Sequence, residues 1–156
     1  MEHLACDMGM KIGLSGNQID KMKLLAKFHD IGKVGIPDYI LKKPAKLTLE
    51  EYEVMKTHTQ IGKRIADESV ELNDISELIY YHHERWDGAG YPEGVAGEDI
   101  PIECRILAIV DTFDAMTNDR PYRKGLPLEV ARDEIIRCKG SQFDPTLTEA
   151  FLELLA

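Results

Sequence analysis

The stretch from His82 to Pro92, which reads HHERWDGAGYP, restricts the possible folds of this chain more than any other segment. Adjacent histidines on a helix point roughly 100° apart, so they can bind one ion readily only where the backbone leaves the helix. The glycines and the proline that follow force the chain out of any helix. Because imidazole and carboxylate groups are common metal ligands, the stretch predicts a helix end that carries a metal site. The alternative is one histidine in the core and one in solvent.

The composition predicts one soluble domain. The chain has 156 residues, of which 44% are hydrophobic and 30% are charged, which is enough to bury a real core. It contains no apolar run of about 18 residues, so we expect no membrane span, and its N-terminus does not have the layout of a signal peptide. The 3 cysteines form no CxxC motif, which is typical of a reducing, cytoplasmic environment.

The net charge of −9 argues against a protein that coats a nucleic acid polymer. An acidic chain can still bind a small phosphate ligand, provided that metal ions, lysines or arginines reverse the sign of the charge locally. A phosphate site in this chain therefore requires such groups beside its acidic residues.

Apolar residues recur at helical spacing along the whole chain, and no segment shows the two-residue alternation of an exposed strand. We therefore expect an all-α bundle of about six or seven helices, with a long Gly/Pro-rich loop between two core helices. That loop, over residues 84–101, is longer than a simple connector, which favours a functional role. The expected helices cover residues 1–14, 17–31, 48–68, 70–83, 102–118, 127–140 and 144 onward.

Several polar candidates fall near the ends of these helices. His29 and Asp30 close the helix over 17–31, with Lys33 one turn beyond His29. His82 lies at the C-terminal end of the helix expected over 70–83, and its side chain is expected to point inward. The expected buried stripe of the helix over 48–68 carries His58 beside Tyr52, Met55, Gly62 and Ile65. A histidine on such a stripe is more often a satisfied core residue than a ligand, so both interpretations stay open at this point.

The helix over 102–118 is the most apolar, and Asp111 is embedded in it. We expect its carboxylate to be buried, and a buried carboxylate needs a partner or a metal. The alternative partner is an arginine such as Arg105. Beyond this helix, Arg120 and Arg123 can fork onto phosphate oxygens, although a solvated basic turn is the more common fate of such a pair.

Taken together, these motifs resemble the HD-GYP family of bacterial phosphodiesterases, within the HD superfamily of metal-dependent phosphohydrolases. Their order and spacing agree with the family from about Leu14 to the C-terminus. The matching segments are residues 29–33 (HDIGK), 56–58 (KTH), 82–92 (HHERWDGAGYP), 100–101 (IP), 111–115 (DTFDA), 120–123 (RPYR) and 143–145 (FDP).

The resemblance implies hydrolysis of cyclic di-GMP to pGpG or GMP by a metal-bridging hydroxide. It implies two or three divalent metal ions, iron or manganese first, with zinc or nickel as alternatives. Histidine and carboxylate ligands suit these metals better than magnesium alone. The implied ligands are His58, His82, His83 and Asp30 for one ion, and His29, Asp30 and Asp111 for the other, with Asp30 bridging the two.

Further roles follow from the same resemblance. Lys33 would meet the scissile phosphate, and Arg120 and Arg123 would clamp phosphate oxygens. The loop through Gly90, Tyr91 and Pro92 would shape the rim of the site and contact diguanylate cyclase (GGDEF) domains. Independently of the resemblance, Glu84 and Asp114 are acids placed to orient a histidine or a clamp arginine, or else to form surface salt bridges.

The chain departs from the family pattern at one ligand, because the family's further upstream histidine would fall before residue 1. We expect residues 1–156 to form one HD-GYP-like domain with an incomplete first helix. It would belong to a longer signalling chain with an N-terminal sensor or receiver domain, and its first metal site and its activity would be weakened. The rival hypotheses are a degenerate module that binds nucleotide or a partner domain, and a hydrolase of another nucleotide such as cyclic GMP-AMP.

Overall fold

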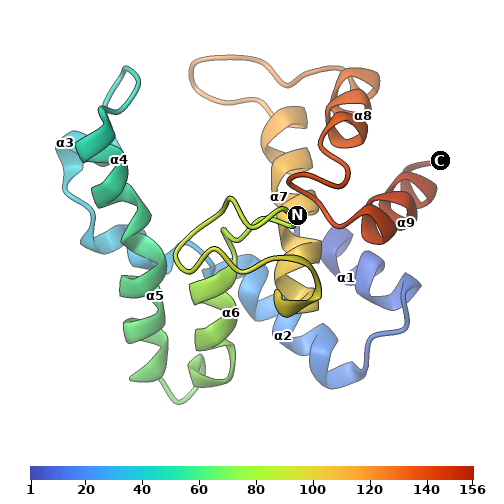
Figure 1. Cartoon of the computed structure of the whole chain (residues 1–156), viewed down its shortest axis with the longest axis horizontal. Coiled ribbons are helices and arrows are strands. Elements are labelled where there is room, and N and C mark those ends of the chain that lie inside the picture. Colours follow the sequence, from blue (N-terminus) through green and yellow to red (C-terminus); the bar gives the residue numbers. More distant parts are fainter.

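The structure, a computed structural model that describes residues 1–156, contains helices and loops but no strand, so the predicted all-α class is confirmed (Figure 1). No helix is both long enough and apolar enough to span a membrane. The α-helices are α1 (Glu2–Lys11), α2 (Gly16–Phe28), α3 (Asp38–Leu41), α4 (Leu49–Lys56), α5 (His58–Asp67), α6 (Ser76–Tyr81), α7 (Ile102–Thr117), α8 (Leu128–Arg137) and α9 (Pro145–Leu155). Short 3-10 helices, η1 (Ile31–Gly35), η2 (Asn73–Ile75) and η3 (Gly97–Asp99), lie between them.

Several helices begin where local side-chain chemistry favours it. Ser15 and Thr48 each form a capping box, with Gln18 and Glu51 as the reciprocal partners, so the first N–H groups of α2 and α4 are satisfied. Asp144 caps α9 by accepting the N–H groups of the first turn. These caps supply donors and acceptors within four residues, which is why the sequence pattern predicts these starts.

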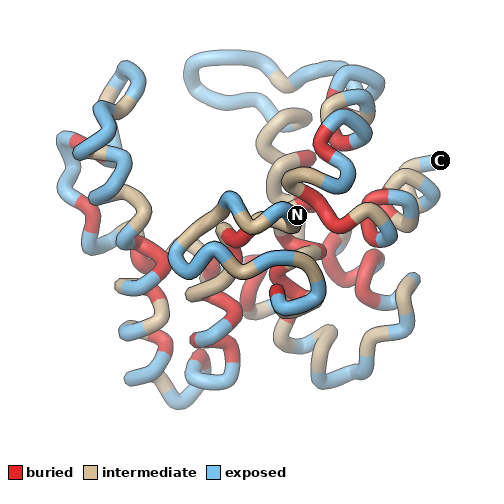
Figure 2. Tube along the Cα trace, viewed as in Figure 1, coloured by how far each residue is buried: buried red, intermediate tan, exposed pale blue.

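Helix α7 is the centre of the molecule, with α1, α8 and α9 on one side and α2 and α6 on the other (Figure 1). Its Ile106, Ile109 and Val110 belong to a buried cluster shared with α1, α8 and α9, while Cys104 and Leu107 belong to a second cluster shared with α2, α5 and α6. Figure 2 shows that the buried positions gather around α7, whereas the ends of α3, α4 and the loop before α8 are exposed. The two cores hold α2, α6 and α7 together.

The nine α-helices outnumber the six or seven expected because the expected helix over 48–68 is broken at Thr57 and because no helix was expected where α3 lies. Three side chains bond back to carbonyls of the last turn of α4: Thr57 to Val54, His58 to Met55 and Thr59 to Lys56. Such bonds compete with the helical ladder. As a result, His58 is the first residue of α5 instead of a mid-helix residue. Tyr52, expected on a buried stripe, is 45% exposed.

Two glycines, Gly32 and Gly62, allow η1 to pack closely against α5. A side chain at Gly32 would place its Cβ 1.8 Å from the backbone oxygen of His58 and 2.5 Å from the nitrogen of Gly62. Only glycine permits this approach. The turn that carries Asp30 and Lys33 is thereby packed directly against the residue that begins α5.

Candidate metal centre

Four side chains from three separate segments meet at one point. Asp30 follows α2, His58 begins α5, and His82 and His83 follow α6. Each offers one ligand atom, and these atoms all lie within 4.8 Å of one another. The Asp30 Oδ1 atom is 3.5 Å from His58 Nε2 and 3.6 Å from His82 Nε2. The core-histidine alternative for His58 is therefore disfavoured, because its ring nitrogen faces a carboxylate and two further imidazoles.

Three imidazoles are oriented by the same device. The Nδ1 atoms of His29, His58 and His82 lie 3.1, 2.7 and 2.5 Å from the carbonyl oxygen three residues earlier. Because a carbonyl can only accept, each Nδ1 carries the proton and each Nε2 presents its lone pair. Histidines that bind metals through one nitrogen commonly donate the other N–H to such an acceptor. Each histidine thus donates a hydrogen bond to a carbonyl at the end of the preceding helix and directs its Nε2 atom toward the cluster.

The buried acceptors of the cluster have no hydrogen-bond partner. Asp30 Oδ1, His58 Nε2 and His82 Nε2 are all buried and unsatisfied, and all three atoms are acceptors that face one another. Unpaired buried polar atoms are costly, and mutually facing lone pairs add repulsion. A divalent cation between them would satisfy all three. The donor set, imidazole nitrogen with carboxylate oxygen, fits Fe, Mn or Zn.

The second oxygen of Asp30 faces a different set of groups. Asp30 Oδ2 lies 3.3 Å from His29 Nε2 and 3.1 Å from the Nζ atom of Lys33. His29 Nε2 is also 3.8 Å from Asp111 Oδ1 on α7. The two oxygens of one carboxylate therefore point to two neighbouring groups of potential ligands, which is the arrangement of a bridging ligand.

The expectation that Asp111 is buried is wrong. Its side chain is 42% exposed, because α7 turns this position toward an open cleft while its apolar neighbours face the two cores. The proposed alternative partner, Arg105, instead bonds to Asp144 at 2.8 Å and to the oxygen of Ile100 at 2.9 Å. The Asp111 carboxylate is therefore free of Arg105 and close to His29.

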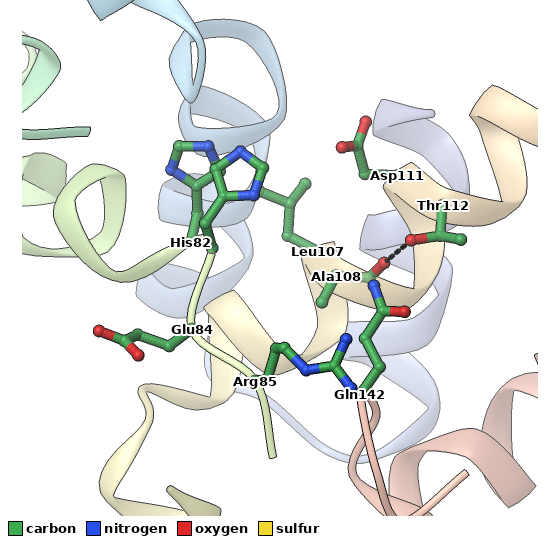
Figure 3. Close-up of a pocket in the computed structure, with 9 residues that line it drawn as sticks. His82, Glu84, Arg85, Leu107, Ala108, Asp111, Thr112 and Gln142 are labelled. Atoms are coloured by element: carbon green, nitrogen blue, oxygen red, sulfur yellow. Dashed lines mark hydrogen bonds between the residues drawn. The ribbon is translucent and has the colours of Figure 1, made fainter. Parts of the chain in front are cut away.

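The cleft beside Asp111 is drawn in Figure 3. His82 and Asp111 lie on one side of it, and Arg85 and Gln142 lie together on the other. The Gln142 segment is held there by two backbone bonds, in which Trp86 donates to the oxygen of Gln142 and Asp87 donates to the oxygen of Ser141. The segment before α9 and the segment after α6 thus form one wall.

The environment sets the protonation of these groups. Burial lowers the pKa of His82, and burial together with the charge of His82 lowers the pKa of His83 to about 2. Burial alone would raise the pKa of Asp30, but the facing imidazoles of His29, His58 and His82 outweigh it and lower that pKa. An ionised carboxylate beside neutral imidazoles is the state that binds a metal ion.

His29 behaves differently from the other two imidazoles. Burial lowers its pKa, but the hydrogen bond to Asp30 and the charges of Asp30 and Asp111 outweigh this effect and raise it. A cation beside Asp30 and Asp111 would replace the proton that these carboxylates favour on His29.

Glu84 was expected to orient a histidine or an arginine, and the structure corrects this. Its buried carboxylate accepts the backbone N–H groups of Glu93 and Gly94, at 2.7 Å and 3.0 Å. The loop that it anchors places the Tyr91 ring parallel to His83, with ring centroids 5.0 Å apart. A side chain at Gly90 would meet the oxygen of His83 at 2.5 Å, so glycine is required for the loop to lie this close. Pro92 follows a cis peptide bond and is exposed.

The remaining sequence candidates lie outside the cluster. Asp114 contacts the side chain of Asn118 at 2.8 Å and no histidine. Arg120 and Arg123 are exposed in the loop before α8, and the guanidinium of Arg123 donates to the oxygen of Ala115. Neither arginine lines the cavities beside the histidines. Sequence reasoning missed Gln142, although it immediately precedes the FDP motif, and it misjudged Tyr52 because the break at Thr57 was not foreseen.

A helical bundle that gathers a His-Asp pair with further histidines around one carboxylate defines the class of HD domains. The family model of the HD domain matches residues 1–147. The chain therefore belongs to the HD-domain family, and its HHERWDGAGYP segment places it in the HD-GYP branch of that family.

The relatives support this assignment. A cyclic di-GMP phosphodiesterase of Thermotoga maritima is 47% identical over 146 residues, which is 92% of this chain and 40% of that protein. A cyclic di-GMP phosphodiesterase response regulator of Xanthomonas campestris is 40% identical over 97% of this chain and 41% of its own length. A 3′3′-cGAMP-specific phosphodiesterase of Vibrio cholerae is 42% identical over 90% of this chain and 27% of its own length. The chain thus spans well under half the length of these curated relatives.

Two solved structures share the fold. A cyclic GMP-AMP-specific phosphodiesterase of V. cholerae superposes with a TM-score of 0.75 at 22% identity, over 97% of this chain and 42% of that one. An HD-GYP-type protein of Bdellovibrio bacteriovorus gives the same TM-score, 0.75, at 17% identity, over 99% of this chain and 49% of that one. At these identities the likeness establishes the fold alone.

Proposed function

We propose that this chain is a metal-dependent phosphodiesterase domain that hydrolyses cyclic di-GMP to pGpG or GMP. The observation that carries the proposal is the position of the Asp30 carboxylate. Its Oδ2 atom faces His29 Nε2, and its buried, unpartnered Oδ1 atom faces His58 Nε2. The proposed ligands are His58, His82, His83 and Asp30 for one ion, and His29, Asp30 and Asp111 for a second.

Two divalent cations would clamp the phosphodiester and lower the pKa of a water molecule enough to make it a nucleophile near neutral pH. The chain's own residues hold and orient the ligands: the carbonyls that end α2, α4 and α6 fix three imidazoles, and Gly32 brings Asp30 against α5. No side-chain nucleophile is needed, and no serine or cysteine lies in the cluster.

Lys33 is proposed to contact the scissile phosphate. Its Nζ is 3.1 Å from Asp30 Oδ2, and its side chain is 39% exposed, so the ammonium can serve the carboxylate and a phosphate oxygen together. It would stabilise the charge that develops on those oxygens in the transition state. Arg120 and Arg123 are proposed to clamp phosphate oxygens of the substrate from the exposed loop before α8.

The choice of cyclic di-GMP over cyclic GMP-AMP rests on the relatives' names. For each substrate, a relative named for it is more than 40% identical to this chain, so 3′3′-cGAMP is the second candidate. We also propose that the domain acts as a cytoplasmic signalling output in a longer bacterial chain, with diguanylate cyclase (GGDEF) domains as partners of the loop through Gly90, Tyr91 and Pro92.

The test is a paired measurement of metal content and turnover. Protein loaded anaerobically with Fe(II) or with Mn(II) is expected to cleave cyclic di-GMP, with pGpG or GMP resolved by chromatography. The Lys33→Met variant should keep its metal and lose about 100-fold or more in kcat, while Lys23→Met on the exposed surface of α2 should match the wild type. Fully loaded protein that cleaves neither cyclic dinucleotide would leave the binding-module hypothesis in its place.

A further inference from the structure

A second hollow adjoins the cleft of the metal centre. It has a volume of about 560 Å³ and is lined by Tyr52, His83, Arg85, Ala89, Gly90, Tyr91 and Gln142. Three of these residues, His83, Arg85 and Gln142, also line the cleft that contains Asp111. A ligand with its phosphate at the metal centre would therefore extend directly into this hollow. Its size falls in the range of small-molecule sites.

The hollow has an aromatic wall. Tyr91 is covered on one face by His83, and its ring meets the Tyr52 ring edge-to-face with centroids 6.3 Å apart. The Nζ of Lys56, which also pairs with Glu53, lies 5.4 Å from the Tyr52 centroid and 5.7 Å from the Tyr91 centroid. Cation–π contacts of this kind help to hold the rings in place. Tyr52 is nevertheless 45% exposed, so part of its aromatic surface remains open beside the hollow.

The opposite wall carries an amide. The backbone of Gln142 is fixed by the N–H of Trp86 at 3.2 Å, whereas its side-chain amide, at the boundary of the cleft, forms no hydrogen bond with the neighbours drawn in Figure 3. The adjacent guanidinium of Arg85 is held by Asp87 at 2.9 and 3.1 Å. A side-chain amide offers a donor and an acceptor side by side, which complements the edge of a purine base.

We propose that this hollow binds one purine base of the cyclic dinucleotide, with Tyr52 as a stacking surface and Gln142 contacting the edge of the base. The inference rests on the proposed function, because the position of the hollow matters only if the phosphate occupies the adjacent centre. An exposed aromatic ring and a side-chain amide could contact a base, and the adjacent candidate metal centre could hold the phosphate of the same nucleotide. Base stacking on an aromatic side chain contributes substantially to such binding.

The experiment compares a ligand that has a base with one that lacks it. Binding of GMP and of ribose 5-phosphate to metal-loaded protein is measured by calorimetry, which does not depend on turnover. The wild type is expected to bind GMP at least about tenfold more tightly than ribose 5-phosphate. Tyr52→Leu should remove most of this difference and raise the KM for cyclic di-GMP about tenfold with little change in kcat, and Tyr52→Phe should restore both.

Controls separate this subsite from general effects. Tyr39→Leu, at a more exposed tyrosine on α3, should behave as the wild type. Gln142→Leu should weaken GMP about tenfold and leave ribose 5-phosphate unchanged, because it unpairs the base edge only. Equal affinity of the wild type for GMP and ribose 5-phosphate, or an unaltered Tyr52→Leu variant, would overturn the subsite.

The two proposals can fail separately. Loaded protein that cleaves no cyclic dinucleotide but keeps a Tyr52-dependent preference for GMP would reject the phosphodiesterase and retain the base subsite. Active protein whose KM does not change in Tyr52→Leu would retain the phosphodiesterase and reject the base subsite. If Tyr52→Leu instead disrupts only the binding of a GGDEF domain, the aromatic wall is a protein interface and the base subsite is rejected.

Discussion

The carboxylate of Glu84 holds the N–H of Gly94 with both of its oxygens, at 3.1 and 3.0 Å. Glu84 directly follows His82 and His83, so the turn that carries two metal-ligand candidates also carries the anchor of the loop that covers them. Tyr91 in that loop stacks on His83. The acid in the HHE sequence therefore connects the metal centre to the rim of the substrate cleft.

Replacing Glu84 by Gln should loosen this loop. The amide keeps one acceptor oxygen but presents its NH₂ group to backbone donors, which we expect to lower the free energy of unfolding by roughly 1–3 kcal/mol. Urea denaturation measures this loss, and the KM for cyclic di-GMP should rise as Tyr91 leaves His83. Glu98→Gln, at an exposed position of the same loop, is the matched control. Equal stability of the two variants would contradict the anchoring role.

His82→Ala should remove metal without unfolding the bundle. The imidazole is buried, and its removal gives up the bond from Nδ1 to the oxygen of Ile79 but also removes one of the unsatisfied acceptors of the cluster, so we expect the metal-free bundle to stay folded. We expect at least about 100-fold weaker metal binding, since loss of even an outer-shell partner costs 10–100-fold. Elemental analysis and circular dichroism check the two halves of the prediction. Full stoichiometric metal in His82→Ala would exclude His82 as a ligand, and His3→Ala is the exposed control.

The metal-free protein should lose stability below about pH 6.5. The unfolded chain takes up protons on its histidines near that pH, whereas burial lowers the pKa of both His82 and His83 in the folded state. Stability is therefore present above pH 6.5 and declines as the pH falls, by up to about 1.4 kcal/mol per pH unit for each of the two residues. The raised pKa of His29 acts in the opposite direction and offsets part of this loss.

Urea unfolding of metal-free wild type and of His83→Asn at about pH 7, 6 and 5 tests this dependence. The wild type should lose more stability than His83→Asn between pH 6.5 and 5, by about the contribution of one histidine. Parallel curves for the two proteins would show that His83 is not held in its neutral form by the fold.

Gly32→Ala should be strongly destabilising. Its Cβ would lie 1.8 Å from the oxygen of His58, so η1 and α5 must separate, at a cost of about 3 kcal/mol or more. Separation also moves Asp30 away from His58, so metal affinity should fall with stability. Gly16→Ala is the control, because its Cβ would meet nothing within 4 Å and alanine favours a helix. A Gly32→Ala protein as stable as Gly16→Ala would refute the close packing of η1 on α5.

Much of the fold follows from local patterns that a sequence displays. The capping residues Ser15, Thr48 and Asp144 act on N–H groups within three residues, and the 3.6-residue period of α7 is visible without any partner. The chemical types of the candidate ligands can also be read from the sequence, because histidines supply imidazole donors and acids supply carboxylate donors. The all-helical class and the HD-GYP assignment both rest on this information.

The tertiary structure decided what those groups face. Whether Asp111 is buried depends on which side of α7 the cores cover, and the partner of Glu84 lies ten residues further along a loop that contains no repeating pattern. The break at Thr57, which makes His58 a helix start, comes from side chains that compete for the carbonyls of α4. Sequence patterns reflect interactions within about one turn of a helix. The convergence of Asp30, His58 and His82 depends instead on packing between segments that are distant in the sequence. A sequence can therefore name the donors, but only the packed chain places their unpaired atoms around one point.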